Sequence, residues 1–437
     1  MSEPNGNTAP NSDRVPPFQK IAYGLGALTN NLLAGAFGNM SIILNLGLGM
    51  NPATIGNIMA CSKFTDAVAD PIMGYVSDHS HTRWGRRRPY IVLGALLSGL
   101  VFALMWQIHS GRSQNFYFWS FLLGTNIFYL SYTIFAAPFI GLGYEMSADY
   151  NERTRIQGYA NFIGQIPWLV LGWCFAFTNY KPLFHDTVEG SRFLAVVIGI
   201  VVIVIGVLPG IICKEPYYSI AQSEQRETVE KRESLWEGLQ RHIAGFLKGF
   251  KITLKNSRFL KLAAATFLVF NGFMLISGLG SYVIIFYVFR GDQTGGARYM
   301  GMFSTALSLC TFGAIAATTW LATKMGKKQA FILSQALAIA GYVLKWFCYR
   351  PGSPLWLLLP APLIAFGLGG LFTTVCSMIA DVCDQDELDN GFRREATFGA
   401  IYWLMVKIGN AAAFALSGHL LNFTGFLQEL GSNQSPK

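Results

Sequence analysis

Residues 61–89 read CSKFTDAVADPIMGYVSDHSHTRWGRRRP, and they set the fold class of the chain. The first part belongs to an apolar run long enough to cross a bilayer, yet it contains Lys63, Asp66 and Asp70. A charge at mid-bilayer costs about 2.5–3.5 kcal/mol on insertion scales, so such residues face protein or water rather than lipid. The arginines that follow are typical of a cytoplasmic segment. The stretch therefore predicts a membrane helix with a polar face and a cytoplasmic end.

Similar apolar runs recur along the whole chain. Its 437 residues are 52% hydrophobic and 13% charged, whereas about a quarter of the residues in a soluble domain are charged. Each run can cross a hydrocarbon core of roughly 30 Å. We therefore predict an all-α membrane protein whose eleven spans lie near residues 21–48, 53–77, 89–108, 115–144, 158–178, 193–213, 259–289, 297–322, 329–349, 354–381 and 396–422.

The two halves of the sequence echo each other. TRWGRRRP at 82–89 matches TKMGKKQA at 323–330, and MSADYNERTR at 146–155 matches MIADVCDQDELDNGFRR at 378–394. Matches at the same place in each half predict two pseudo-repeated helical bundles, which is the parallel repeat of major facilitator transporters. We expect four parts: a cytoplasmic tail (1–20), an N-terminal six-helix bundle (21–213), a cytoplasmic linker (214–258) and a C-terminal bundle of five spans (259–437).

The basic residues predict the orientation. Most of them fall on the segments that are inside if the N-terminus is cytoplasmic, so topology explains the net charge of +9 and no nucleic-acid partner is needed. The linker contains SLWEGLQRHIAGFLKGFKITL at 234–254, where Ser234 and Glu237 form a capping-box pattern. This pattern predicts an amphipathic helix that lies on the membrane or packs on the cytoplasmic loops.

The charged residues of the second span share one helix face. Asp66 and Asp70 are four residues apart and Lys63 precedes Asp66 by three, so their side chains are neighbours. Pro71 lacks an N–H group and releases the carbonyl of Ala67 from its helical partner. These oxygens predict a site for a hard monovalent cation such as Na⁺, or a pair of carboxylates that shares a proton. The alternative is a salt-bridge cluster that only locks helices together.

A further lysine lies well inside the last recognised span. We expect Lys407 to pair with the carboxylates of the second span and to release them when a cation enters; the alternative is a lysine that extends to the membrane surface. Other charges follow the second and fourth spans. They predict ion pairs that stabilise one access state, or a topology signal alone, and comprise Asp78, Arg86, Arg87, Glu145, Asp149 and Arg153.

Several motifs together resemble the glycoside–pentoside–hexuronide:cation symporters of the major facilitator superfamily. They are DAVADPIMGYVSDHSHTRWGRRRP at 66–89, YGLGALTNN at 23–31, YTIFAAP at 132–138, GYEMSADYNERTR at 143–155 and ADVCDQDE at 380–387, together with Lys407. The resemblance covers nearly the whole chain. It implies a coupling-cation site at Asp66 and Asp70, with Thr133 as a further oxygen and with Lys63 and Lys407 as coupled charges.

The resemblance also implies where the substrate binds, although the charges that hold a galactoside in the family are replaced here by Asn31, Ala136 and Asn161. We therefore expect a different glycoside, a pentoside or an acidic sugar. The candidate substrate-binding residues are Asn31, Tyr23, Asn161, Trp168 and Trp403. Asn31 can donate to and accept from a hydroxyl, and the aromatic rings either stack on a sugar face or simply pack.

These features predict a secondary transporter of the inner (plasma) membrane. We expect a monomer that carries a sugar or glycoside together with H⁺ or Na⁺ by alternating access. Ala69 stands where the family has an amide oxygen, which favours protons over sodium. The alternatives are a lysolipid transporter and a truncated, non-transporting homologue, since the family has twelve spans. No HExxH, Ser/His/Asp or nucleotide-binding glycine motif is present, so we expect no enzyme activity and no cofactor besides the coupling ion.

Overall fold

The computed structural model describes residues 14–80, 82–147, 149–215, 256–352, 354–390 and 395–426, together with 240, 250 and 253. The linker segment with the predicted amphipathic helix lies almost entirely outside these residues. The N-terminal half contains α1 (Pro17–Leu46), α2 (Pro52–Asp78), α3 (Arg88–Met105), α4 (Gln114–Glu145), α5 (Tyr150–Gly164), α6 (Ile166–Leu171), α7 (Cys174–Thr178), α8 (Thr187–Gly206) and α9 (Leu208–Ile212). The C-terminal half contains α12 (Ser257–Tyr282), a π-helix (Val283–Val288), α13 (Gln293–Met325), α14 (Lys327–Cys348), a 3-10 turn (Pro354–Leu358), α15 (Ala361–Asn390) and α16 (Glu395–Phe423).

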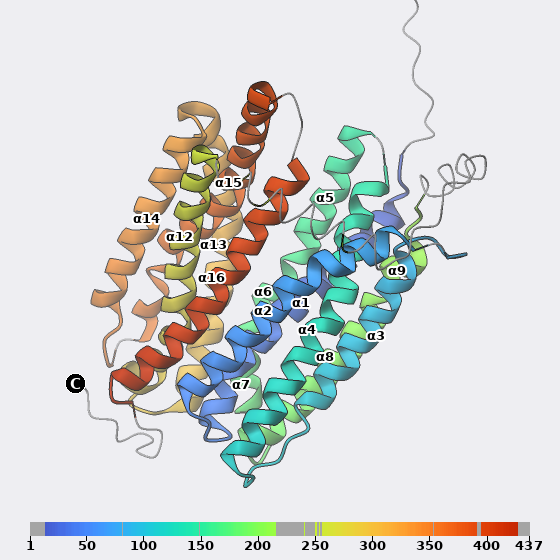
Figure 1. Cartoon of the computed structure of the whole chain (residues 1–437). Helices are drawn as coiled ribbons and strands as arrows, with labels where there is room; N and C mark the ends of the chain where they lie inside the picture. The colour runs from blue at the N-terminus through green and yellow to red at the C-terminus, as the bar shows by residue number, and fades with distance from the viewer. Residues whose placement is uncertain are drawn as a thin grey trace, which may run out of the picture.

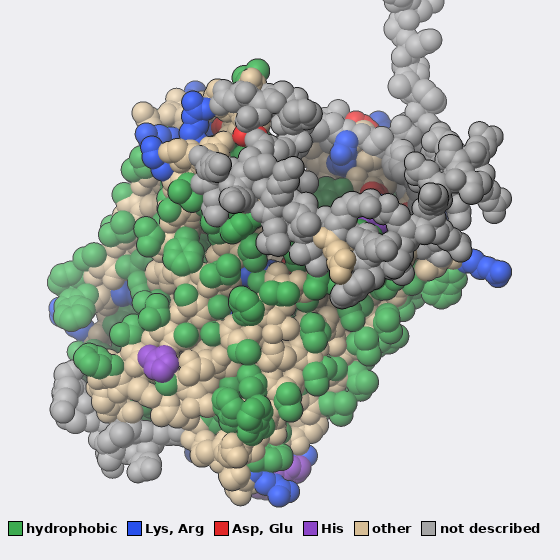
Figure 2. All heavy atoms as spheres, viewed as in Figure 1, with side chains coloured by type: hydrophobic (Ala, Val, Ile, Leu, Met, Phe, Trp, Pro, Cys, Tyr) green, Lys and Arg blue, Asp and Glu red, His purple; other side chains and the backbone are tan. Residues whose placement is uncertain are grey.

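The described helices form a multi-pass membrane bundle. Eight of them are long and apolar enough to cross a membrane by length and composition alone. The remaining predicted spans are α1, α2, which contains the three interior charges, and the broken helix α5 to α7. Figure 2 shows hydrophobic side chains across the middle of one face, with charged side chains towards its two ends. The prediction of an all-α membrane protein with two helical halves is confirmed.

The fifth span, predicted near 158–178, consists of three shorter helices, α5, α6 and α7. Pro167 stands in the first turn of α6 and cannot donate a helical hydrogen bond, and Gly172 ends that helix. Because α6 is short, its carbonyl groups are available to the other half. The carbonyl of Leu169 accepts a hydrogen bond from Thr305 Oγ1 at 3.0 Å, and that of Trp168 accepts one from Ser308 Oγ at 3.1 Å.

The two halves touch along two seams. One seam joins α2 to α16, and the other joins α6 and α7 to α13 (Figure 1). We call the end of the bundle that carries the loop between α2 and α3 the basic end. At the opposite end the two halves are in contact along both seams. Asn422 Nδ2 donates to Asn51 Oδ1 at 2.7 Å in the first seam, and Trp173 Nε1 donates to Thr305 Oγ1 at 2.8 Å in the second.

Glycines allow this close approach. A Cβ atom on Gly56 of α2 would lie 2.5 Å from the carbonyl oxygen of Phe414, and one on Gly418 of α16 would lie 2.3 Å from that of Pro52. These obstacles are backbone atoms of the facing helix, so the helices themselves would have to separate. The close contact between α2 and α16 therefore requires glycine, which has no side chain, at both positions.

We expect Gly56→Val to destabilise the protein by about 1–3 kcal/mol, the usual cost of overpacking a tight contact. The matched control is Gly74→Val on the same helix, because nothing lies within 4 Å of a Cβ built there. Thermal unfolding of the purified protein measures both variants. Equal melting temperatures for the two would show that the seam does not need the glycine.

Candidate cation site and charge network

Four charged side chains meet where α2 faces α16. Lys407 Nζ lies 2.5 Å from Asp70 Oδ2 and 3.1 Å from Asp66 Oδ2. Lys63 Nζ lies 3.6 Å from Asp66 Oδ2 and 4.2 Å from the ring centroid of Tyr129. Two carboxylates of the N-terminal half are thus neutralised by one ammonium group from each half. The structure brings together every charged residue that the sequence assigned to this site.

Further oxygen atoms surround the carboxylates. Thr133 Oγ1 of α4 donates a hydrogen bond to Asp66 Oδ1 at 3.3 Å. Asp70 Oδ1 is buried and has no hydrogen-bond partner among the described residues. The described chain contains no group of three or more His, Cys, Asp or Glu side chains that could hold a metal ion. Two carboxylates and a hydroxyl offer oxygen atoms to a proton or a monovalent cation, and Lys407 occupies the place between the two carboxylates.

Polar contacts between α2 and α4 fix the rotation of α2. The hydroxyls of Ser62 and Thr125 share a hydrogen bond of 2.6 Å, and Thr65 Oγ1 donates to Asn126 Oδ1 at 2.5 Å. The sequence analysis missed these four residues, because small polar residues in a membrane span carry no distinctive spacing. Ala69 lies to one side of this site, in an apolar groove between the same helices. Because an alanine side chain has no oxygen, Ala69 adds none to the carboxylates.

Two of the predicted substrate-binding residues are engaged within the N-terminal half. Asn31 Nδ2 donates to the carbonyl of Gly164 at 2.6 Å, which leaves its side-chain oxygen for other contacts. Tyr23 is only 3% exposed, and its ring stacks on Phe139 with centroids 4.6 Å apart. In this conformation Tyr23 packs inside the half and its ring cannot stack on a sugar.

The other predicted substrate-binding residues remain accessible. Asn161 is exposed on α5, and Trp168 is 37% exposed at the seam with α13. Trp403 is 49% exposed and lies one helical turn from Lys407 on α16. Residues four apart on a helix share a face, so Trp403 and Lys407 belong to the same stripe.

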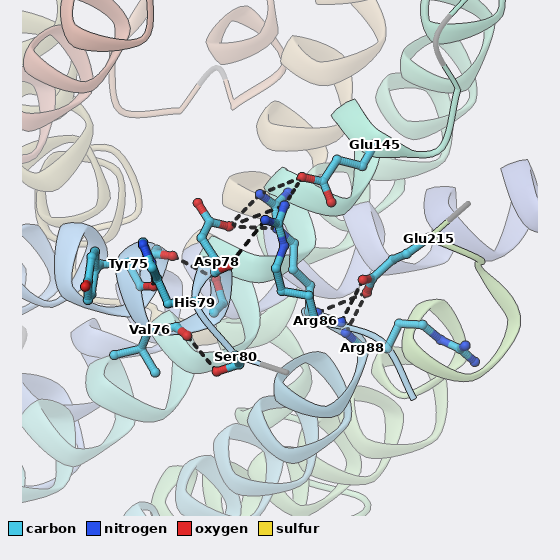
Figure 3. A network of polar contacts seen from close by, with 12 residues as sticks. Tyr75, Val76, Asp78, His79, Ser80, Arg86, Arg88, Glu145 and Glu215 are labelled. Carbon is cyan, nitrogen blue, oxygen red and sulfur yellow. Dashed lines mark hydrogen bonds and ion pairs between the residues drawn. The ribbon is translucent and has the colours of Figure 1, made fainter. Parts of the chain in front are cut away.

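A second network of charges lies at the basic end (Figure 3). Arg87 Nη2 lies 2.6 Å from Asp78 Oδ1 and 3.1 Å from Glu145 Oε1, and Arg86 also pairs with Glu145. All four residues belong to the N-terminal half. The network therefore joins the ends of α2, α3 and α4, rather than the two halves.

Asp149 and Arg153, which the sequence grouped with this network, lie at the start of α5. There the N–H group of Arg153 donates to the carbonyl of Asp149 at 2.9 Å. Asp149 lines a polar depression with Arg14, Glu152 and Arg155.

Glu215 organises the loop that carries the arginines, and the sequence analysis missed it. Its carboxylate accepts hydrogen bonds from the N–H groups of Arg86, Arg87 and Arg88 at 2.8, 3.0 and 3.0 Å. Gly85 precedes them at φ +111°, a conformation that favours glycine. Glu215 thus caps α3 from the far end of the sixth span. A sequence separation of about 130 residues gives no local signal for such a contact.

The equivalent loop of the C-terminal half repeats this geometry in part. Gly326 has φ +87°, and Lys327 Nζ lies 2.6 Å from Asp381 Oδ1. These residues belong to the two motif echoes between the halves. The structure thus places an ion pair between the paired motifs in the second half as well.

We expect Glu215→Ala to destabilise the protein by about 1–3 kcal/mol, because three N–H groups, one buried and two partly buried, would lose their acceptor. The matched control is Arg83→Ala, an exposed residue of the same loop. Thermal unfolding of the purified variants provides the measurement. A Glu215→Ala protein as stable as the control would show that the cap is dispensable.

Glu152 ties the chain before α1 to α5. Its carboxylate accepts from the N–H of Val15 at 3.0 Å and pairs with Lys20 at 2.5 Å. Burial by itself raises the pKa of Glu152, but the hydrogen bond and charge of Lys20, together with the Val15 N–H and Arg155, outweigh it and hold the pKa below its ordinary value. A lowered pKa means that this carboxylate stabilises the fold above its unfolded pKa, and that the contribution is lost as the pH falls through the folded pKa.

We therefore expect wild type to be more stable than Glu152→Gln at pH 7, and this difference to shrink below about pH 4, where the ordinary carboxyl titrates. Unfolding at a series of pH values measures the difference. Exposed Glu189, changed to Gln, is the control. A difference that is the same at pH 3 and pH 7 would contradict the charged interaction.

Comparison with known proteins agrees with this architecture. Two solved structures share the fold: the nucleoside transporter NupG, with a TM-score of 0.66 at 11% identity over 95% of this chain and 94% of its own, and a D-xylose–proton symporter, with a TM-score of 0.61 at 12% identity over 92% and 88%. The mouse sodium-dependent lysophosphatidylcholine symporter 1 is 22% identical over 95% of this chain and 79% of its own length.

Two bacterial sugar carriers are similar along most of their length. The isoprimeverose transporter of Lactiplantibacillus pentosus is 23% identical over 94% of this chain and 81% of its own, and the glucuronide carrier protein homolog of Escherichia coli is 23% identical over 93% and 84%. The family model for MFS/sugar transport proteins matches residues 22–437. The chain therefore belongs to the MFS/sugar transport family, the glycoside–pentoside–hexuronide:cation symporters of the major facilitator superfamily.

Proposed function

We propose that this protein carries a sugar or glycoside across the bacterial inner membrane together with a cation, by alternating access. The observation that carries the proposal is the position of Lys407, an ammonium group of one half held between two carboxylates of the other. The family supports the choice of a sugar. The geometry supports the coupling, because the carboxylates lie at the seam that must change when access alternates.

The coupling follows from the cost of a buried charge. Removing one partner from a buried ion pair costs about 3–5 kcal/mol, because the other charge is left uncompensated. Asp66 is almost fully buried and the Asp70 side chain is 38% exposed, so the two carboxylates, with Lys63 beside Asp66, need one further positive partner. Either Lys407 or the coupling cation supplies it. When the cation enters, Lys407 leaves, and the ionic tie between α2 and α16 is broken.

The orientation follows from the basic residues. With the basic end in the cytoplasm, the seams are closed on the outer side, and this conformation is the one that faces inward. The Asp78, Arg86, Arg87 and Glu145 network then lies on the cytoplasmic side and keeps α2, α3 and α4 together while the halves move.

The proposed coupling ion is mainly the proton, with sodium or lithium as weaker substitutes. A proton needs one carboxylate, whereas a hard cation needs several oxygens. Asp70 Oδ1 and Thr133 Oγ1 supply some of these oxygens, and Ala69 supplies none. A sodium site here is therefore less complete than a proton site.

We expect Asp70→Asn and Asp66→Cys each to abolish uphill accumulation while leaving the protein in the membrane, since each removes a coupling charge but little volume. The measurement is uptake of labelled glycosides into cells or proteoliposomes, with lysophosphatidylcholine as the competing substrate class. Facilitated exchange can survive in both variants. Unchanged concentrative uptake in both would defeat the assigned role of the pair.

We expect accumulation to collapse when a proton ionophore is added, and sodium at fixed pH to stimulate it only weakly. Substrate accumulation with and without sodium, and then with the ionophore, provides the test. Strong sodium stimulation that survives the ionophore would replace the proton with sodium as the coupling ion.

A further inference from the structure

The charges that meet at the seam of α2 and α16 balance one another. The charged side chains of this cluster are Lys63, Asp66, Asp70 and Lys407. Their charges sum to zero. Lys345 lies apart from them in the last turn of α14, with its ammonium group 5.0 Å from the ring centroid of Phe303. The empty cation site is therefore electrically neutral.

Loading the site changes this balance. A bound proton or sodium ion brings one positive charge, so the loaded site carries a net charge of +1 whichever ion is coupled. Of the two lysines, Lys63 stays beside Asp66 and over the ring of Tyr129, whereas Lys407 has to leave its place between the carboxylates. An unpaired ammonium at this depth is unfavourable until it finds an anion.

We infer that the substrate supplies this anion: it is an acidic sugar, a glycoside or pentoside that bears one carboxylate, and this carboxylate pairs with Lys407 after the cation has released it. The inference rests on the proposed function and narrows its substrate class. A neutral sugar would leave the loaded site with one uncompensated positive charge, whereas a monoanion would return the net charge of the site to zero.

The surroundings of Lys407 suit such a ligand. Its side chain is 20% exposed, so the ammonium can be reached, whereas Asp66 is almost wholly covered. Trp403 precedes it by one turn on the same face, with half of its surface exposed. Side chains at this spacing have Cβ atoms roughly 5–6 Å apart, about the width of a sugar ring. The ring can rest on the indole while its carboxylate meets the ammonium.

The charge balance also explains why transport would be coupled. The cation alone leaves the site at +1 and the acidic sugar alone leaves it at −1, whereas both together give zero. Each ligand therefore raises the affinity for the other, and by linkage the two effects are equal. One cation moves with one monoanion, so the loaded carrier moves no net charge.

The test uses matched sugars that differ only in the carboxylate. Purified protein in proteoliposomes is offered methyl β-glucuronide against methyl β-glucoside and against methyl β-xyloside, which lacks the sixth carbon, and methyl β-galacturonide against methyl β-galactoside. We expect an acid to be preferred about tenfold or more over its neutral partner, the usual worth of a hydrogen bond to a charged group. Its uptake should not respond to a membrane potential set with potassium and valinomycin.

Two variants test the role of Lys407 through binding rather than transport. With the coupling cation present, Lys407→Gln should lose the preference for the acid and Lys407→Arg should retain it, as measured by calorimetry. Lys328→Gln, at an exposed position, is the control for a lost surface charge.

Cation-dependent uptake of a neutral sugar and not of its acid would overturn the inference and leave the proposed function intact. So would an acid preference that survives in Lys407→Gln. If none of these sugars were taken up, with or without the cation, the proposed function itself would be overturned.

Discussion

The structure depends on two carboxylates that cannot be left uncompensated in a bilayer. Asp66 and Asp70 belong to one half of the molecule, and Lys407, which lies between them, belongs to the other. Their attraction holds α2 against α16 between the two ends of these helices. In the proposed coupling the same attraction makes the seam responsive, because a competing cation displaces the lysine. A purely apolar seam would hold the halves together equally well, but it would not respond to any ion.

The rest of the N-terminal half keeps these charges in register. Hydroxyl and amide contacts between α2 and α4 fix the rotation of α2, so the carboxylates face α16 and Thr133. At the basic end, Glu215 holds the loop whose arginines pair with Asp78 and Glu145. At the other end, Gly56 and Gly418 let the two helix backbones approach. The positions of the charges are thus set by contacts along the full length of α2.

Much of this was predictable from the sequence, because the governing constraints are local. Span length, the spacing of Lys63, Asp66 and Asp70 on one helix face, and the echo of TRWGRRRP in TKMGKKQA are all visible in short windows. The fold class follows from them, and the family agrees. The pairing of Lys407 with α2 could be anticipated only as a requirement for a buried charge to find a partner. Two kinds of feature were not predicted. The first is contacts between neutral or distant groups, such as the hydrogen bonds of Glu215 to the loop before α3 and of Ser62 to Thr125. The second is the break of the fifth span at Pro167 and Gly172. Their causes are tertiary, and no local pattern reports them.

Duplication explains the two seams, and divergence explains why they differ. The seam of α2 with α16 corresponds, under the repeat, to the seam of α13 with the broken fifth span. The first is held by charges, whereas in the second Thr305 and Ser308 donate to the carbonyls of Leu169 and Trp168. A cation competes with an ammonium group for a carboxylate, but it does not compete with a hydroxyl for a carbonyl to any similar extent. In the proposed coupling, ion binding would therefore act on the ionic seam and leave the hydrogen-bonded seam intact. In a carrier that rocks about its centre, the hydrogen-bonded seam is the natural place for the hinge, and the ionic seam is the natural place for control.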